Sequence, residues 1–271
     1  MNREHDNNNI PGLSRRLMAV AKMVPYGSRI ADVGTDHGFV PIYLAREGQI
    51  EHAVAMDLRK GPLDRASEHV LKYGLENVIT TRLSDGLEKL CIGEVDTVIC
   101  AGMGGILMQK ILEKGDLRQK KIKTLILQPQ SEILLFRSFL RQNAYEITKE
   151  EFLVEDGKYY SVIKADVLET IHENCPKSYT DAIDRIKAVL TRKDIYEEKA
   201  ITNSQLIRIC DRFGPFIILS QNPDFKSFLV HEKEVCDTIL YKIKGVENSH
   251  KQRFDEILTK RSDIEIALHL L

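Results

Sequence analysis

The residues best suited to chemistry lie in one stretch, from Ala31 to Gly38, which reads ADVGTDHG. It follows an apolar run and opens a helix, which is where a doubly wound fold binds an adenosine-containing cofactor. The glycine pattern of dinucleotide sites is incomplete here, because Asp36 stands where the middle glycine would let the backbone approach a pyrophosphate. A carboxylate repels a phosphate group, so the turn favours a cofactor without phosphate, and S-adenosylmethionine is the expected one.

Carboxylates also follow the next two expected strands. Asp57 comes 23 residues after Gly34, where it can accept both ribose hydroxyls, and Asp85 is placed for the exocyclic amine of adenine. Asp32 could hold a methionine ammonium group through a water. Each carboxylate alone fits a solvated turn or a helix cap equally well, but their order at successive strand ends favours a cofactor site. The residues expected to bind the cofactor are Asp32, Gly34, Thr35, Gly38, Asp57, Leu58, Asp85, Gly86, Ala101, Gly102 and Met103.

The fourth expected strand ends in a glycine-rich segment, Ala101-Gly102-Met103-Gly104-Gly105. One interpretation is a tight turn that needs positive φ angles, which explains one or two of the glycines. Three glycines in four residues also favour close approach by a ligand, which would meet bare backbone amides at a helix N-terminus.

The elements that must position these residues alternate along the first 165 positions. Two β-rich runs at 145–154 and 159–165 then flank a turn, Glu155-Asp156-Gly157-Lys158, and this pattern predicts a hairpin. Five βα units closed by a hairpin predict an α/β fold with a mostly parallel sheet covered on both faces, typical of a class I (Rossmann-like) methyltransferase. Strands are expected at 29–33, 52–56, 78–83, 95–100 and 125–127, and helices at 13–24, 39–48, 61–73, 106–113 and 131–142.

The rest of the chain is expected to be helical. A charged helical segment covers 178–200, and a break follows at 211–215. Amphipathic patterns at 224–244 and 247–270, joined at Lys244-Gly245-Val246, predict an antiparallel, coiled-coil-like helical hairpin. We therefore expect a methyltransferase domain at 1–167 and a helical C-terminal domain at 168–271.

Composition limits the classes of partner. Of 271 residues 43% are hydrophobic, and 39 basic against 40 acidic residues give a net charge of −1, so any nucleic-acid contact must come from a local patch. No apolar run approaches the ~20 residues of a membrane span, and the polar N-terminus lacks a signal peptide, so a cytoplasmic protein is expected. The five cysteines are widely separated and form no C-x-x-C pair, which argues against disulfides and a metal site.

Together these motifs resemble one family. Residues 32–38, Asp57 with Gly61-Pro62-Leu63, residues 101–105 and Gln128-Pro129-Gln130 are similar to the bacterial TrmK family. Its members are S-adenosylmethionine-dependent tRNA (adenine-N1)-methyltransferases that modify adenine 22. The resemblance covers about residues 10–166 and, more loosely, Phe213-Gly214-Pro215 and the terminal helices, whereas residues of about 170–208 form an extra segment.

The resemblance implies direct methyl transfer to adenine N1, whose lone pair makes a strong base unnecessary, so that alignment supplies most of the rate. A carboxylate that accepts a hydrogen bond from the 6-amino group would stabilise the developing positive charge, and Asp36 is the candidate. The alternative is that Asp36 caps the helix that begins near Phe39. His37 is the second catalytic candidate, paired with Asp36 or with a backbone carbonyl.

Substrate contacts are expected from Gly104, Gly105, Gln128, Gln130 and Tyr160. Gln128 could instead shape a strand end. Tyr159 and Tyr160 alternate in the hairpin, so one is expected in the core and the other is free to stack on a base.

The expected partner is tRNA, clamped by the helical hairpin, although a dimerisation element or a packing arm fits that hairpin almost as well. Oligomeric state stays open between monomer and homodimer. Basic candidates for RNA contact are Lys120, Lys121, Lys123, Arg137, Arg141, Lys242, Lys244, Lys251, Arg253, Lys260 and Arg261. The alternative functions are a class I methyltransferase acting on a small molecule or protein, an NAD-dependent oxidoreductase, and a non-catalytic RNA-binding module.

Overall fold

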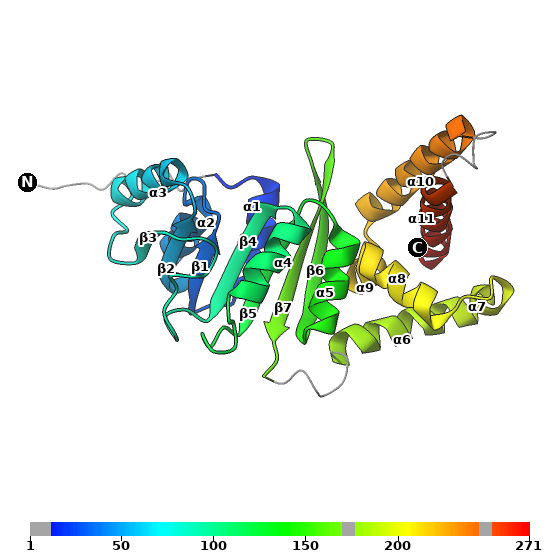
Figure 1. Cartoon of the computed structure of the whole chain (residues 1–271), viewed down its shortest axis with the longest axis horizontal. Coiled ribbons are helices and arrows are strands. Elements are labelled where there is room, and N and C mark those ends of the chain that lie inside the picture. Colours follow the sequence, from blue (N-terminus) through cyan, green and yellow to red (C-terminus); the bar gives the residue numbers. More distant parts are fainter. Residues whose placement is uncertain (1–11, 170–176, 244–250) are drawn as a thin grey trace, which may run out of the picture.

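The computed structural model describes residues 12–169, 177–243 and 251–271. A seven-stranded sheet runs through the N-terminal part, and a group of helices lies beyond one edge of it (Figure 1). The strands lie in the order β3-β2-β1-β4-β5-β7-β6. Their bounds are β1 Ser28–Val33, β2 Ile50–Asp57, β3 Ile79–Leu83, β4 Thr97–Met103, β5 Thr124–Pro129, β6 Tyr145–Glu155 and β7 Lys158–Val167.

The predicted fold class is confirmed by the strand pairing. Strands β1 to β5 pair in parallel, whereas β7 is antiparallel to both β5 and β6. The central strand β1 has β2 on one side and β4 on the other, with Val33 opposite both Met56 and Cys100. The chain therefore reverses its direction of travel across the sheet between β3 and β4, so the switch point lies between β1 and β4.

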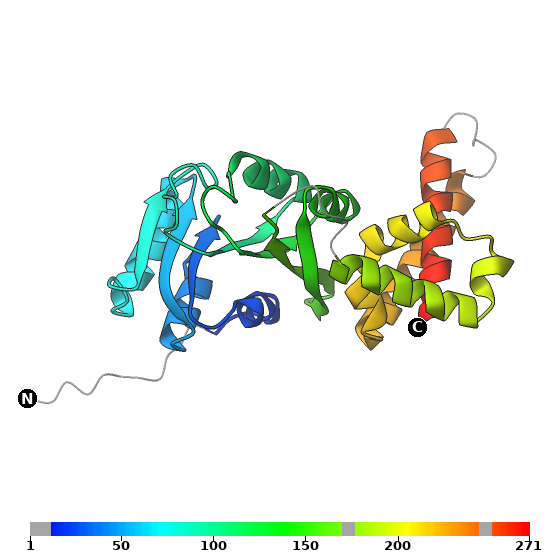
Figure 2. The same ribbon diagram turned by 90° about the horizontal axis from the view of Figure 1, so that it is seen from below.

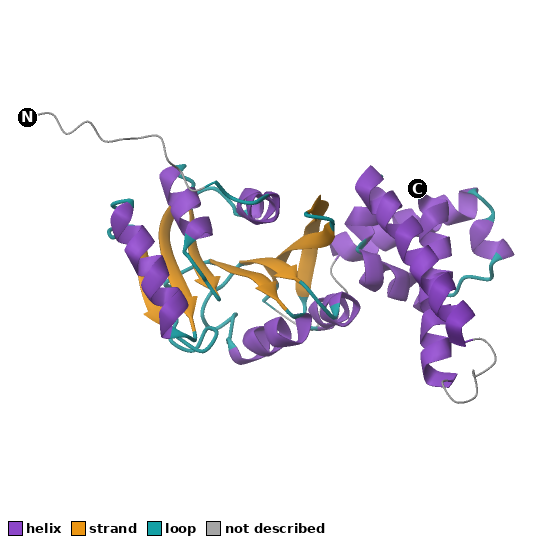
Figure 3. Ribbon diagram, turned by 90° about the horizontal axis from the view of Figure 1, so that it is seen from above, coloured by secondary structure: helices purple, strands orange, loops and turns teal. Residues whose placement is uncertain are grey.

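Helices cover both faces of the sheet. Because successive strand residues point to opposite faces, Ile30 and Ala53 join one apolar cluster while Ala31 and Val54 join another. The first cluster includes α1, α2 and α3, and the second includes α4 and α5, which lie on the other side of the sheet in Figures 2 and 3. These helices are α1 Arg15–Met23, α2 Phe39–Arg46, α3 Lys60–Lys72, α4 Gly105–Lys114 and α5 Ile133–Gln142.

The C-terminal helices pack beside β6, the edge strand, and so cover backbone groups that would otherwise form an open sheet edge (Figure 1). The segment expected as one helix at 178–200 is two helices, because Asp194 adopts a left-handed conformation with φ 57°. Helices α10 and α11 are antiparallel, since Lys233 pairs with Glu265 and Asp237 with Arg261. The expected junction at 244–246 lies outside the described residues. The bounds are α6 Lys177–Arg192, α7 Ile195–Glu198, α8 Asn203–Phe213, α9 Pro215–Leu219, α10 Pro223–Ile243 and α11 Lys251–Leu270.

A buried ionic cluster joins the sheet to these helices. Arg137 of α5 donates through Nε to Glu150 Oε1 of β6 at 2.6 Å, and both side chains are almost fully buried. Burial raises the pKa of Glu150, against the lowering effect of Arg137. Asp211 of α8 accepts hydrogen bonds from Arg141 at 2.9 Å and from the Tyr179 hydroxyl at 2.7 Å. Two of the expected RNA-contact residues, Arg137 and Arg141, therefore serve the junction, which corrects their assignment.

The contacts at this junction explain why the Phe213-Gly214-Pro215 segment needs a glycine at its centre. Gly214 has φ 85°, and a Cβ there would lie 2.5 Å from the nearest Glu150 carboxylate oxygen. The next helix, α9, begins at Pro215, and the Phe216 amide donates to Glu150 Oε2 at 3.2 Å. Only glycine fits between this carboxylate and the start of α9.

None of the helices in the described ranges combines the length and the apolar character of a membrane span.

We expect Arg137→Met to lower the free energy of unfolding by about 3–5 kcal/mol, because it leaves the Glu150 carboxylate buried without its cation. Urea denaturation measures this loss. Arg192→Met on the exposed side of α6 makes the same chemical change and should alter stability by less than about 0.5 kcal/mol. Equal losses in the two variants would contradict a stabilising role for the buried pair.

Candidate active site

A cavity of about 630 Å³ opens at the carboxyl end of β1, next to the end of β4. This is the switch point, where doubly wound sheets bind their ligands. Ten of the residues expected from the sequence line it, from four separate parts of the chain: Asp32, Gly34, Thr35, Asp36, His37, Gly38, Ala101, Gly102, Gln130 and Tyr160.

Two glycines shape the turn after β1. Gly34 has φ 77°, and its amide and that of Thr35 donate to the Met56 carbonyl at 2.8 and 2.9 Å. A Cβ on Gly34 would lie 2.0 Å from Met103 Cε, so this side chain occupies the space that a larger residue would need. Gly38 has φ 69° and begins α2 as its N-cap. Both glycines are thus favoured by their backbone conformation.

Asp32 places a buried carboxylate on the cavity. The residue is 8% exposed, and burial raises its pKa to about 6, with the Thr35 hydroxyl acting in the opposite direction and the Asp57 charge in the same one. Within residues 12–169, 177–243 and 251–271, no basic side chain forms an ion pair with Asp32. A buried carboxylate of this kind is stabilised by a cationic ligand group.

Asp36 lies on the same turn in a different environment. Its side chain is 61% exposed, its Oδ1 accepts a hydrogen bond from Arg65 of α3, and its Oδ2 lies 3.4 Å from His37 Nε2. The hydrogen bond from Arg65 lowers the pKa of Asp36, so an ionised carboxylate faces solvent at the cavity. Gly38 is the N-cap of α2, and the Asp36 side chain bonds to Arg65 instead of to this helix, so the alternative that Asp36 caps α2 is wrong, and the expected pairing of His37 with Asp36 is present.

Gln128 is buried behind the cavity wall. Its Oε1 accepts hydrogen bonds from Arg16 Nη1 at 2.7 Å and from the Gly102 amide at 3.1 Å. Gln128 therefore shapes the end of β4, which was the structural alternative for this residue, while Gln130 is exposed and lines the cavity. No local sequence pattern indicates a role for Arg16, because its partner lies 112 residues away.

The two hairpin tyrosines are both half-buried and have different neighbours. Tyr160 lines the cavity, with its ring 5.6 Å from the Arg16 guanidinium carbon. Tyr159 packs among the rings of Phe152 and Phe228, at the contact with α10. Glu155, expected only as part of the hairpin turn, also lines the cavity and accepts a hydrogen bond from the Arg16 amide at 3.2 Å.

The acidic ends of β2 and β3 lie beside one another, outside the lining of the main cavity. Asp57 is buried and accepts a hydrogen bond from the Arg59 amide at 2.7 Å, while Leu58 is 64% exposed. Asp85 and Gly86 line a separate hollow of about 160 Å³ against α4. The Ser84 amide donates to the Asp57 carbonyl at 3.0 Å, which brings the two strand ends together.

The glycines after β4 have different roles. Gly102, with φ 80°, lines the cavity. The Gly105 amide donates to the Ser131 carbonyl at 3.1 Å, and a Cβ there would lie 2.8 Å from that oxygen. A Cβ on Gly104 would lie 2.8 Å from Ser131 Oγ. Close packing against the segment before α5 accounts for Gly104 and Gly105, and the Gly105 amide is already bonded, so contact of these two with a substrate stays a prediction.

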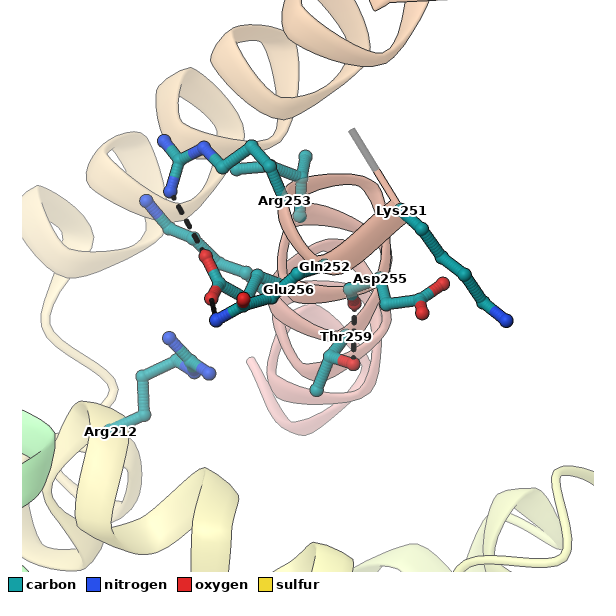
Figure 4. Close-up of a pocket in the computed structure, with 9 residues that line it drawn as sticks. Arg212, Lys251, Gln252, Arg253, Asp255, Glu256 and Thr259 are labelled. Atoms are coloured by element: carbon teal, nitrogen blue, oxygen red, sulfur yellow. Dashed lines mark hydrogen bonds and ion pairs between the residues drawn. The ribbon is translucent and has the colours of Figure 1, made fainter. Parts of the chain in front are cut away.

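A larger hollow of about 890 Å³ lies in the helical part, between the end of α8 and the first turns of α11. Figure 4 shows Arg212 pointing toward it and Lys251 pointing away, with Arg253 and Gln252 bonded to Glu256. Its lining carries both signs of charge, and in the described part of the chain no group of His, Cys, Asp or Glu side chains there or elsewhere is arranged to hold a metal ion.

Known proteins match this chain in both sequence and fold. The family described as "Methyltransferase domain" matches residues 13–163. The tRNA (adenine(22)-N(1))-methyltransferase of Bacillus subtilis strain 168 is 39% identical over 154 residues, which are 57% of this chain. The match spans 65% of that relative's length, just under two thirds.

Solved structures extend the likeness to the C-terminal helices. The crystal structure of the B. subtilis m1A22 tRNA methyltransferase TrmK has a TM-score of 0.76 and 29% identity, and the match covers 95% of this chain and 99% of that one. The Mycoplasma capricolum TrmK structure, in complex with S-adenosylhomocysteine, has a TM-score of 0.70 and 26% identity, with 94% and 99% covered. The resemblance found in the motifs is thereby confirmed.

Asp32 should make stability depend on pH. Its folded pKa of about 6 exceeds the unfolded value of about 3.9, so the folded state binds this proton more tightly and loses stability as the pH rises between these two values. We expect Asp32→Asn to remove this loss, so that the variant gains about 3 kcal/mol relative to the wild type between pH 4 and pH 7. Urea denaturation across this range tests the shift, and parallel pH curves for the two proteins would contradict it.

Proposed function

This chain belongs to the methyltransferase domain family, and we propose that it transfers a methyl group from S-adenosylmethionine to N1 of adenine 22 in tRNA. One observation carries the proposal. A single turn presents two carboxylates to one cavity: Asp32, which is buried and has no basic partner among the described residues, and Asp36, which is exposed and held by an arginine. The first suits a cationic cofactor and the second suits a base with an exocyclic amine. The names of the relatives support the substrate.

The cofactor-binding residues fit an adenosyl group that carries an ammonium. Asp32, with a pKa of about 6, is mostly ionised at neutral pH and would attract the ammonium. Asp57 ends β2, where a carboxylate can accept ribose hydroxyls, and Asp85 lies at the adjacent strand end for the adenine amine. The exposed apolar side chain of Leu58 would cover the adenosyl group. When bound, the cofactor supplies an electrophilic methyl group on a sulfonium. We retain the other expected cofactor contacts in the proposal: Gly34, Thr35, Gly38, Gly86, Ala101, Gly102 and Met103.

The methyl transfer needs alignment more than base catalysis. A bond forms from the adenine N1 lone pair to the methyl carbon as the carbon–sulfur bond breaks, so positive charge passes from sulfur to the base. Asp36, kept ionised by Arg65, accepts a hydrogen bond from the 6-amino group and stabilises that charge. The Tyr160 ring and the Gln130 amide line the same cavity, where they can stack on the base and bond to its edge.

We further propose that residues 168–271 contact the body of the tRNA. We also propose that the reaction takes place in the cytoplasm. The basic residues at the start of α11, Lys251 and Arg253, border the hollow of Figure 4 and offer positive charge to phosphates. The methyltransferase domain, residues 1–167, would then receive a base splayed out of its stack.

A methyl-transfer assay on unmodified tRNA transcripts tests the proposal, with mass spectrometry locating the methylated base. We expect methylation at position 22, none on a transcript with guanine there, and activity that falls steeply as salt rises. Activity independent of salt, on a small molecule or a protein, would favour the alternative class I methyltransferase. No methylation of any tRNA would overturn the proposal.

Asp36→Asn should lower kcat about 100-fold, because the neutral amide stabilises the developing charge on the base poorly. Binding of S-adenosylhomocysteine, measured by calorimetry, should change little. Asp116→Asn, at an exposed position outside the lining of the cavity, is the matched control and should leave both quantities unchanged. Wild-type kcat in Asp36→Asn would remove Asp36 from the mechanism.

A further inference from the structure

One face of α3 packs against the turn that carries Asp36. Arg65 donates to Asp36, and the Ala66 Cβ lies 3.4 Å from where a Cβ on Gly38 would be. One turn further along α3, His69 Nδ1 lies 2.9 Å from the carbonyl oxygen of His37, and since a carbonyl only accepts, Nδ1 carries the proton. Three neighbouring residues of the turn are therefore contacted by side chains three and four positions apart on one helix.

Aromatic stacking adds to these contacts. The His37 ring stacks on Phe39 at 5.1 Å between centroids and on His69 at 5.5 Å, and Phe39 stacks on His69 at 5.0 Å. His37 Nδ1 is buried and has no hydrogen-bond partner among the described residues, whereas its Nε2 faces Asp36. Nε2 is therefore the ring nitrogen that can donate to the carboxylate.

Asp36 itself is more exposed than its neighbours, so its orientation depends on few contacts. The charged groups that face it are Arg65 of α3, Arg59 in the segment before α3, and His37 on its own turn. Of these, Arg65 makes a direct hydrogen bond to Oδ1, whereas Oδ2 lies 3.4 Å from His37 Nε2, and the Asp36 side chain as a whole is 61% exposed. Without the guanidinium an exposed aspartate would sample several rotamers.

We propose that Arg65 is a positioning residue for methyl transfer, which holds Asp36 through one carboxylate oxygen so that the other is presented to the adenine 6-amino group. This inference rests on the proposed function. The bond joins α3, which follows the end of β2, to the turn after β1, and so links the two strand ends that the proposal assigns to the cofactor and to the base. The sequence offered no sign of it, because Arg65 lies 29 residues from Asp36.

An arginine at this place could instead bind an RNA phosphate, since its side chain is 46% exposed. The two roles differ in what they change. A phosphate contact contributes to tRNA affinity, and its loss raises KM and lowers the salt dependence. A positioning contact acts on the aligned complex, and its loss lowers kcat with KM unchanged.

A double-mutant cycle on the full chain separates these roles, with Arg65→Gln, Asp36→Asn and the two combined, assayed on tRNA transcripts. We expect Arg65→Gln to lower kcat about tenfold with KM for tRNA and its salt dependence unchanged, and to cost less than about twofold in the Asp36→Asn background. Arg65→Lys should recover part of the loss, because a lysine keeps the charge but not the planar donor geometry. Lys72→Gln removes a charge from the same helix, two turns away, and should change nothing.

The possible outcomes distinguish the positioning role of Arg65 from the role of Asp36 and from the proposed function. Arg65→Gln and Asp36→Asn losses that multiply in the double variant, or a rise in KM with unchanged kcat, overturn the positioning role while the proposed function stands. Wild-type kcat in Asp36→Asn overturns both the positioning role and the role of Asp36, although methylation at adenine 22 would still support the proposed function. A wild-type protein that methylates no tRNA overturns the proposed function and the inference with it.

Discussion

The position of β1 between two parallel neighbours determines where this protein can bind a ligand. The chain leaves β1 for α2 on one face of the sheet, and leaves β4 for α4 on the other. Two connections that depart to opposite faces cannot close over the strand ends they leave, so a cavity remains there. Helix α1 and the hairpin then provide the outer wall through Arg16, Glu155 and Tyr160. The site thus follows from topology before any catalytic side chain is considered.

Much of this was accessible from the sequence, because it depends on local order. Strand ends, glycines with positive φ and the Glu155-to-Lys158 turn are short-range features, whereas alternation along the hairpin did not decide which of Tyr159 and Tyr160 faces the site. Contacts between distant segments were not accessible. Arg16 and Gln128 are 112 residues apart, and their amphipathic helix and strand give no sign that they meet. The cofactor residues were expected as one set, but Asp85 and Gly86 line a separate hollow, because β3 lies two strands from β1.

The helical part illustrates the same limit through buried charge. The sequence predicts Arg137 as a surface residue that contacts RNA, since an arginine on an amphipathic helix is usually solvated. Its burial against Glu150 depends on α8 and α9, which cover that end of α5. No local sequence pattern predicts this packing. Gly214 was recognisable as part of a motif, but its reason, a carboxylate within 3 Å of any Cβ, appears only when β6 and α9 are placed together.

Asp32 and Asp36 show how one turn provides two kinds of carboxylate. They are four residues apart, yet burial raises the pKa of Asp32 to about 6 while Arg65 lowers that of Asp36. The difference follows from position, since Asp32 still belongs to the buried part of β1 and Asp36 has left the sheet for the exposed approach to α2. A buried carboxylate without a cation gains most from a positively charged ligand, whereas an exposed one held by a guanidinium is ready to accept a hydrogen bond. A dinucleotide-binding turn, with glycine in place of Asp36, would lack the second group, so the departure from that pattern gives the same turn the two kinds of carboxylate that the proposed cofactor and base require.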